Sequence, residues 1–516
     1  MMADRLIGRR AFVGLAGTLI LTTTALSACS NGGTNTSGGG TGASDGIAET
    51  TAGRVRGTYQ DGAWRFLGVP YARATERFVP AQAVDPWEGI QEADAYGKTS
   101  YQAALLGMPA QNGSDNDNDC LNLNIWTPEP GVGGGRPVMV WLHGGGFSTG
   151  SANDEGYDGA ALAVGQDVVV VGINHRLNAF GHLDLSAYGD KYRQSSNVGI
   201  IDIQTALQWV QDNIAVFGGD PGNITLFGQS GGGAKILALM AAPDAQGLFH
   251  RAIIQSGATE AMGVSFSSKE ISERLGELTL QELSIAADDV EAIQDVGVDE
   301  LLAASDAARE QTGREFDVNL ALSADYGIEW GPVIDPDGYM PTAPVTDTGF
   351  AEPGRDVALL IGSNFSEWTH ISELAQQTDI TAEQTAAFEA AYPSRPATDA
   401  TYVDSFIRLP MLKIMSHKAD QGGADVYAYL FNYGDDPYHG AEIPYVFGRG
   451  EGSLGEQIPA AWASFASTGA PAVPGLPDWE PYTREGGATM LLDEDSELVH
   501  HHDRELMALL EPDYKY

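Results

Sequence analysis

Five short runs of apolar and β-branched residues set the strongest limit on how this chain can fold. Each run is almost continuously apolar, which is typical of a strand buried on both faces of a parallel sheet. Helix-periodic stretches such as 202–217 separate them, and parallel strands need long crossovers of this kind. We therefore predict an α/β fold, with helices on both faces of a mostly parallel central sheet. The runs span 137–144, 167–175, 223–228, 356–364 and 425–433.

Two other stretches, 265–314 and 381–419, are helix-periodic and contain no strand pattern. A separate helical domain is the alternative interpretation, but no linker sets either stretch apart from its surroundings. We predict that both are helical excursions over one edge of the sheet. Residues 47–516 are then expected to form a single domain.

The first residues carry the pattern of an export signal. Arg9 and Arg10 precede an apolar run that ends in small residues, as in twin-arginine signals, which export folded proteins. The segment LSAC, which ends at Cys29, resembles the site where bacterial lipoproteins are cut before a lipid-modified cysteine. We expect an export signal at 1–28, followed at 29–46 by a lipidated Cys29 and a flexible Gly/Ser/Thr linker.

A lipid on Cys29 would tether the protein to a membrane surface outside the cytoplasm, on the periplasmic face or the cell surface. A single-pass membrane anchor is the alternative. The apolar run is short for that role and carries threonines.

Composition excludes several kinds of partner. The net charge of −42 argues against nucleic-acid binding, which needs a cationic surface. With Cys29 lipidated, Cys120 has no second cysteine for an intramolecular disulfide or a shared metal. The histidines at 500–502 and the acidic stretch 114–119 are more consistent with an exposed loop and a solvated turn than with metal sites. We expect no metal and no cofactor.

Residues able to carry out catalysis follow four of the five runs. Glycines at 144–146 follow the first, Ser230 the third, Glu367 the fourth and His439 the fifth. The carboxyl ends of parallel strands share one edge of a sheet, so these groups are expected to meet there. A serine needs a base to activate it, and the imidazole needs a carboxylate to orient it. The pattern predicts Ser230 as nucleophile, His439 as base and Glu367 as acid.

The surroundings of Ser230 strengthen this prediction. The serine lies between glycines where a strand pattern becomes a helix pattern, which is typical of a tight turn that exposes the hydroxyl. The backbone N–H of Gly231, at the helix N-terminus, would point toward an oxyanion. Asp335 is the main rival to Glu367 as the acid, since it follows an apolar run; Asp202 and Asp220 are weaker rivals.

Several long segments resemble the type B carboxylesterases, the cholinesterase-like serine esterases of the α/β-hydrolase fold. The resemblance runs from about 52 to 512, and its clearest segments are 119–126, 217–233, 362–368 and 439–448. It implies ester hydrolysis through an acyl-enzyme on Ser230. It also implies that Gly145, Gly146 and Gly231 form the oxyanion hole, and that Glu442 is a buried carboxylate behind the histidine.

Three residues depart from that family pattern. Gln229 replaces the glutamate that usually precedes the serine, and Cys120 lacks its usual disulfide partner. Lys235 stands where a small or apolar residue is expected, and a buried ion pair is the only explanation that the sequence suggests. No tryptophan lies between Tyr101 and Cys120, where the family's choline-binding loop would be. Cholinesterase activity is therefore not expected.

The sequence thus predicts a serine esterase for small to medium carboxylic esters, aromatic ones included. A lipase or an amidase with the same triad is the alternative within this class. A non-catalytic surface-binding protein on the same scaffold is the alternative from another class, and the complete triad argues against it. The exact acyl and alcohol groups and the oligomeric state stay open.

Overall fold

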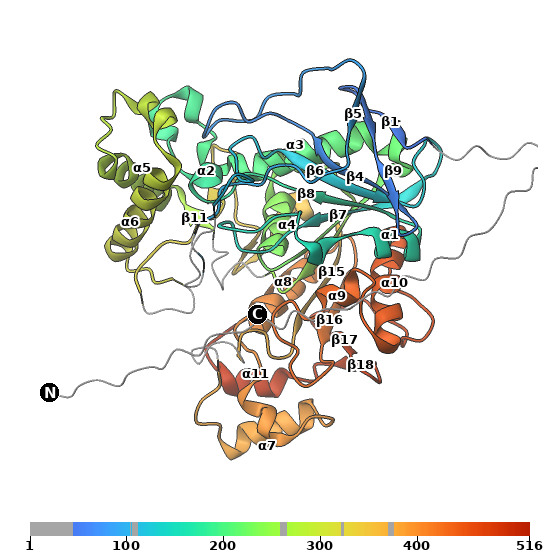
Figure 1. Ribbon diagram of the computed structural model, residues 1–516. Coiled ribbons are helices and arrows are strands. Elements are labelled where there is room, and N and C mark those ends of the chain that lie inside the picture. The colour runs from blue at the N-terminus through green and yellow to red at the C-terminus, as the bar shows by residue number, and fades with distance from the viewer. Residues whose placement is uncertain are drawn as a thin grey trace, which may run out of the picture. The chain divides into compact units, whose positions relative to one another are not determined.

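The structure is a computed structural model that describes residues 45–103, 105, 112–257, 266–320, 325–369 and 376–515. The described residues belong to one compact unit (Figure 1). The predicted export signal, Cys29 and all but the end of the linker lie outside them. Within these ranges, no helix has the length and apolar character needed to cross a bilayer.

A mixed sheet of eleven strands forms the centre of the unit, in the order β18-β17-β16-β15-β10-β9-β7-β8-β6-β4-β3. The strands from β17 to β8 in that order are parallel, and β18, β6, β4 and β3 add antiparallel margins. The bounds are β3 Thr58–Gln60, β4 Ala63–Pro70, β6 Asn122–Thr127, β7 Arg136–Leu142, β8 Val169–Ile173, β9 Gly219–Gln229, β10 Arg251–Gln255, β15 Ala358–Asn364, β16 Val426–Phe431, β17 Ala488–Leu492 and β18 Glu497–His500.

The five predicted runs are β7, β8, β9, β15 and β16, so the α/β prediction with a mostly parallel sheet is confirmed. Strand β10 was not predicted, yet it lies between β9 and β15. Three small sheets stand apart from the main one. They comprise β1 Ile47–Glu49, β2 Arg54–Arg56 and β5 Ile90–Glu92; β11 Ser267–Ser268 and β12 Val333–Ile334; and β13 Val345–Thr346 and β14 Gly349–Phe350.

Helices cover both faces of the sheet because side chains alternate along each strand. On β7, Val138, Val140 and Leu142 face one hydrophobic cluster, while Met139 and Trp141 face the other. The first cluster packs against α3 (Val198–Asn213), α4 (Gly231–Ala241) and α8 (Arg408–Asp420). The second packs against α1 (Ala160–Gln166) and α10 (Gly452–Thr468).

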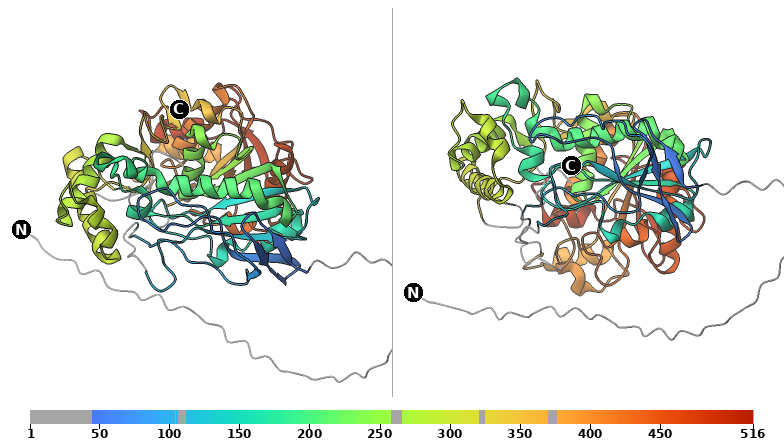
Figure 2. Two further views of the ribbon diagram at one scale, coloured as in Figure 1. Left: turned by 90° about the horizontal axis from the view of Figure 1, so that it is seen from above. Right: turned by 45° about the horizontal axis from the view of Figure 1, so that its top comes forward.

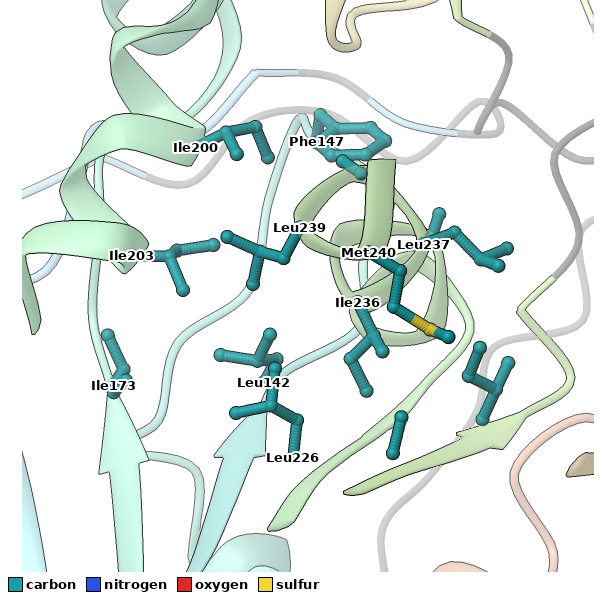
Figure 3. Close-up of a cluster of buried hydrophobic side chains, with 14 of the residues drawn as sticks. Leu142, Phe147, Ile173, Ile200, Ile203, Leu226, Ile236, Leu237, Leu239 and Met240 are labelled. Atoms are coloured by element: carbon teal, nitrogen blue, oxygen red, sulfur yellow. The ribbon is translucent and has the colours of Figure 1, made fainter. Parts of the chain in front are cut away.

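Figure 3 shows the first cluster at α4. Leu142 and Leu226 of the sheet face Ile236 and Leu239 of the helix, and Ile203 of α3 lies alongside. These side chains are at most 1 % exposed. Their burial holds α4 against β7 and β9.

The helical excursion predicted at 265–314 is present, whereas the one predicted at 381–419 is wrong for its second half, which forms a helix on the sheet. Helices α5 (Lys269–Glu282) and α6 (Val298–Phe316) pack on each other beside the sheet (Figures 1 and 2). In the second stretch, α7 (Ala382–Ala391) packs on α11 (Arg504–Leu510), whereas α8 packs directly on β15 and β16. The other helices are α2 Asn178–His182 and α9 Ile443–Val446, with 3-10 turns at Glu155–Tyr157, Ser186–Tyr188, Asp190–Tyr192, Ser195–Asn197, Ile214–Phe217, Pro243–Ala245, Val290–Asp295, Glu352–Gly354 and Ala397–Thr401.

A fully buried ion pair ties α3 to the end of β8. The guanidinium of Arg176 donates from Nε and Nη2 to the two oxygens of Asp202, at 2.8 and 2.6 Å. Neither side chain is exposed to solvent. Removing one partner would leave the other charge buried without compensation, which is strongly destabilising.

We predict that Asp202→Asn lowers the free energy of unfolding by about 3–5 kcal/mol, because it leaves Arg176 charged and unpaired in the interior. Urea unfolding followed by tryptophan fluorescence measures the change. Asp190→Asn is the matched control, since Asp190 pairs with Arg193 in an exposed i,i+3 bridge. The control is expected to change stability by less than about 1 kcal/mol. Equal effects of both variants would contradict the prediction.

Candidate active site

Ser230 occupies a strained turn between β9 and α4. Its backbone has φ 57° and ψ −125°, a conformation that residues with a side chain rarely adopt. Its backbone N–H donates to the carbonyl of Gln255 at 2.8 Å. A Cβ on Gly232 would overlap the carbonyl of Leu142, so this turn tolerates only glycine there. The turn leaves Ser230 partly exposed at the carboxyl edge of the sheet.

His439 and Glu367 form a close pair at the same edge. Nδ1 of His439 donates to Oε2 of Glu367 at 2.5 Å, and its backbone N–H donates to the Glu367 carbonyl at 2.9 Å. The Glu367 side chain is fully buried. This hydrogen bond places the imidazole proton on Nδ1 and leaves the lone pair on Nε2, which is the tautomer that a general base needs.

Sequence reasoning missed two groups that hold Glu367. Its other oxygen, Oε1, accepts from the Ser256 hydroxyl at 2.6 Å and from the backbone N–H of Asn364 at 2.7 Å. Ser256 directly follows β10, the strand that was not predicted. A search of the residues after every parallel strand would have found it.

Glu442 lies behind this pair, but the structure does not place it against His439. Its carboxyl accepts from Asn364 Nδ2 at 2.6 Å and from Gln255 Nε2 at 3.0 Å. Burial and then the charge of Glu367 raise the pKa of Glu442. The same two causes raise the pKa of buried Asp404 to about 8. Both shifts favour neutral carboxyl groups around Glu367.

Gln229 contacts the base nitrogen of the histidine. Its Nε2 donates to His439 Nε2 at 3.1 Å. Among the hydrogen bonds of the described residues, none joins the Ser230 hydroxyl to His439. Gln229 directly precedes Ser230, so the structure brings the histidine next to the serine turn without showing the serine–histidine hydrogen bond itself.

The predicted oxyanion loop lies against the start of α4. A Cβ on Gly231 would lie 2.6 Å from the backbone nitrogen of Gly146, and one on Gly144 would lie 3.4 Å from Ser230 Cβ. Gly145 and Gly146 have φ values of 86° and 58°. Within the described part of the chain, no hydrogen bond uses the backbone N–H of Gly145, Gly146 or Gly231. Three donors are therefore available beside Ser230.

Trp368 borders the site, a role that sequence reasoning did not assign. Its ring centroid lies 4.7 Å from that of the His439 imidazole, at an interplanar angle of 31°. The ring restricts how the imidazole can turn. It also adds an aromatic surface beside the base.

The rival carboxylates have other partners. Asp202 pairs with Arg176, and Asp335 forms an ion pair with Lys269. Asp220 accepts the backbone N–H of Gly222 at 2.8 Å, closing a local turn. Glu367 is thus the acid that the structure places on His439.

The two alternative metal sites do not come together. No group of three or more histidine, cysteine or acidic side chains suited to a metal occurs among the described residues. Asp119 instead accepts from Arg73 Nε at 2.6 Å. The expectation of an exposed loop at 500–502 is wrong for His502, whose buried ring packs edge-on against Tyr392.

The fold and this site define the chain as a serine esterase of the α/β-hydrolase class. The model of the carboxylesterase family matches residues 44–395 and 390–508, and the chain belongs to that family. The family resemblance read from the sequence is confirmed. The chain is a carboxylic ester hydrolase.

Individual relatives agree with this assignment. The chain is 32 % identical to para-nitrobenzyl esterase of Bacillus subtilis over 495 residues, which cover 89 % of this chain and 96 % of the relative. It is 45 % identical to phenmedipham hydrolase of Pseudarthrobacter oxydans over 217 residues, 41 % of this chain and 42 % of the relative. A solved esterase from Clostridium hathewayi that can hydrolyze aliphatic aromatic polyesters superposes with a TM-score of 0.79 at 32 % identity, covering 90 % of this chain and 98 % of that one.

The contact of Gln229 with His439 generates a prediction on pH dependence. Gln229→Glu would place a carboxylate beside Nε2 and so favour the protonated imidazole. The acid limb of the kcat/KM profile is expected to move upward by about one pH unit. The shift is measured from kcat/KM for p-nitrophenyl acetate between about pH 5 and about pH 9, a range that covers the titration of a histidine. Gln229→Met is the neutral control, and a Glu variant with an unmoved limb would refute the prediction.

Proposed function

We propose that this protein hydrolyses carboxylic esters through an acyl-enzyme on Ser230, with His439 as general base and Glu367 as the orienting acid. The observation that carries the proposal is the Nδ1–carboxylate bond of His439, made at the edge where the strained serine turn lies. The proposed nucleophile follows β9, the proposed acid follows β15 and the proposed base follows β16, so each comes after a different parallel strand.

The reaction begins when the Ser230 oxygen attacks the ester carbonyl and passes its proton to His439 Nε2. The C–O bond to the alcohol breaks as His439 returns the proton to the departing alkoxide. Water then attacks the acyl carbonyl and passes a proton to His439 Nε2. The bond to the Ser230 oxygen breaks as His439 returns that proton to the serine, and the carboxylic acid product leaves. Glu367 stabilises the imidazolium in each step without taking its proton.

The free N–H groups of Gly145, Gly146 and Gly231 would bind the oxyanion that forms in both steps. Donors of this kind contribute about 3–4 kcal/mol each to stabilising the transition state. The helix dipole of α4 adds positive potential at Gly231. His439 can take the serine proton only after the Gln229 amide leaves Nε2, so substrate binding must displace this contact.

The substrates we propose are small to medium esters, including aromatic ones. The names of two relatives support an aromatic group: a para-nitrobenzyl esterase and an esterase that can hydrolyze aliphatic aromatic polyesters. The ring of Trp368 beside His439 supports the same choice. Gln229, an amide in place of a carboxylate, removes a charge that would favour cationic substrates.

We propose that this activity resides on a membrane surface outside the cytoplasm, through a lipid on Cys29. The arginine pair and the LSAC segment support this location. In a bacterial host that processes lipoproteins, Cys29→Ala is expected to move the esterase from the membrane fraction to the soluble exported fraction. Cys120→Ala is the matched control, because Cys120 is buried in the core. Membrane association that persists in Cys29→Ala would refute the location.

The central prediction concerns the nucleophile. Ser230→Ala is expected to lower kcat on p-nitrophenyl esters by roughly 10⁶-fold, and Glu367→Gln by a smaller factor on the order of 10⁴. A series from acetyl to long acyl chains, with matching anilides, separates an esterase from a lipase or an amidase. The purified chain from 47 onward suits the assay.

Ser467→Ala serves as the control for Ser230→Ala, because the Ser467 hydroxyl donates to the Ala463 carbonyl within α10 and to none of the proposed catalytic groups. A Ser230→Ala protein that keeps wild-type turnover would overturn the mechanism. A folded wild type that is inactive on every ester would favour the non-catalytic binding protein.

A further inference from the structure

Lys235 is a buried cation on the helix that follows the nucleophile. It lies on the second turn of α4 and is 0 % exposed. Its Nζ donates to the backbone carbonyl of His143 at 2.8 Å. His143 is the residue directly before the glycine loop at 144–146. The hydrogen bond therefore joins the N-terminal end of this loop to α4, the helix that follows Ser230.

The ion pair expected for Lys235 is absent from the described residues, so that expectation is wrong. The side chain is instead surrounded by rings. Nζ lies 5.7 Å from the centroid of Phe147, a ring that packs beside α4 in Figure 3. The rings of His143 and His175 stack at 5.0 Å, and His182 packs edge-on against Phe147.

These histidines stay neutral beside the lysine. Burial and then Lys235 lower the pKa of His143 and of His175, and burial lowers the pKa of His182 to about 3. Each ring donates from Nδ1 to a backbone carbonyl. Burial also lowers the pKa of Lys235 to about 7. Both the ammonium and the amine form keep an N–H for the His143 carbonyl.

The hydrogen bond of Lys235 reinforces a close contact between the backbone after β7 and the backbone of the first turn of α4. A Cβ on Gly232 would overlap the Leu142 carbonyl and lie 3.1 Å from the His143 carbonyl. Van der Waals contact alone resists compression but does not stop the loop from lifting away. A directional hydrogen bond from Lys235 of the same helix prevents this movement, because it holds the His143 carbonyl close to α4.

We propose that Lys235 is a positioning residue for the oxyanion hole: its bond to the His143 carbonyl fixes the N–H groups of Gly145 and Gly146 relative to that of Gly231. The inference rests on the proposed function, which assigns these three donors. Lys235 is not a second base for Ser230, because its bond goes to the carbonyl and not to the serine hydroxyl.

Donors aimed at the tetrahedral oxyanion stabilise the transition state more than the bound ester. Loss of the Lys235 bond should therefore lower kcat and leave KM nearly unchanged. A lysine that only stabilises the fold would lower the unfolding temperature without this separation.

Lys418 provides a matched control on a different helix. It too is 0 % exposed, donates from Nζ to a backbone carbonyl, that of Arg355, at 2.8 Å, and lies 5.9 Å from a ring centroid, that of Phe350. It belongs to α8 and touches none of the proposed catalytic groups. Lys235→Met and Lys418→Met thus remove the same kind of interaction at two places.

The experiment compares these variants on a p-nitrophenyl ester and with a trifluoromethyl ketone, which forms a tetrahedral oxyanion with an active-site serine. For Lys235→Met we expect kcat to fall at least about tenfold, KM to stay within about twofold, and Ki for the ketone to rise by the same factor as kcat falls. For Lys418→Met we expect both quantities within about twofold of wild type, with a lower unfolding temperature.

Equal kcat and Ki in the two Met variants would overturn the inference. Lys235→Gln keeps an N–H donor on a shorter side chain, and it serves in place of Lys235→Met if that variant fails to fold. Its kcat and Ki are expected to lie between the wild-type and Met values. If the Met variant is lost, the kcat of Lys235→Gln is expected below, and its Ki above, the wild-type value. Wild-type values in Lys235→Gln would also overturn the inference.

Labelling of each variant with a fluorophosphonate separates this inference from the proposed function. Stoichiometric labelling of Ser230 in the wild type supports the nucleophile whatever Lys235 does. A wild type that is not labelled would overturn the proposed function. A fully labelled Lys235→Met protein with wild-type kcat would overturn only the role of Lys235.

Discussion

The site depends on one steric constraint, the crossing of the end of β7 over the first turn of α4. At this crossing Gly232 lies against the Leu142 carbonyl and Gly231 lies against Gly146, with no room for a Cβ at either glycine. The crossing forces Ser230 into its left-handed conformation, which costs on the order of 1–3 kcal/mol. Burial of the aliphatic side chains between α4 and the sheet offsets that strain. The same contact that strains the serine brings three free N–H groups beside it.

A second constraint is electrostatic, since the buried carboxyl groups of Glu442 and Asp404 both interact with the charge of Glu367, the partner of His439. Burial and mutual repulsion favour the neutral forms of Glu442 and Asp404. Hydrogen bonds from Ser256 and Asn364 fix the Glu367 oxygen that does not bind His439. Trp462 of α10 donates to Gln255, which in turn donates to Glu442. This chain links the far face of the sheet to the site and keeps the carboxyl groups in place.

The features that sequence reasoning predicted correctly are those carried by local pattern. The runs that form β7, β8, β9, β15 and β16 are almost continuously apolar, and the Ser230 turn is marked by adjacent glycines. Strand β10 escaped notice because it has five residues and polar ends. The bond from Ser256 to Glu367 spans 111 positions and leaves no periodic signal. Lys235 was misread for a related reason: its partner is a backbone carbonyl, which every residue carries, so no side-chain pattern reveals it.

Gln229 and Lys235, the two residues near the serine that depart from the family pattern, both affect how the charges of the transition state are stabilised. In the mechanism that we propose, formation of the acyl-enzyme creates an oxyanion at the glycine N–H groups and an imidazolium at His439. On the proposed mechanism, a carboxylate at 229 would stabilise the imidazolium and repel the oxyanion, whereas the Gln229 amide does neither. In its ammonium form Lys235, which lacks a counter-ion among the described residues, would add positive potential on the helix that we propose to bind the oxyanion. Both residues shift stabilisation from the imidazolium toward the oxyanion. A site balanced in this way suits neutral esters, whose transition states gain most from binding the oxyanion.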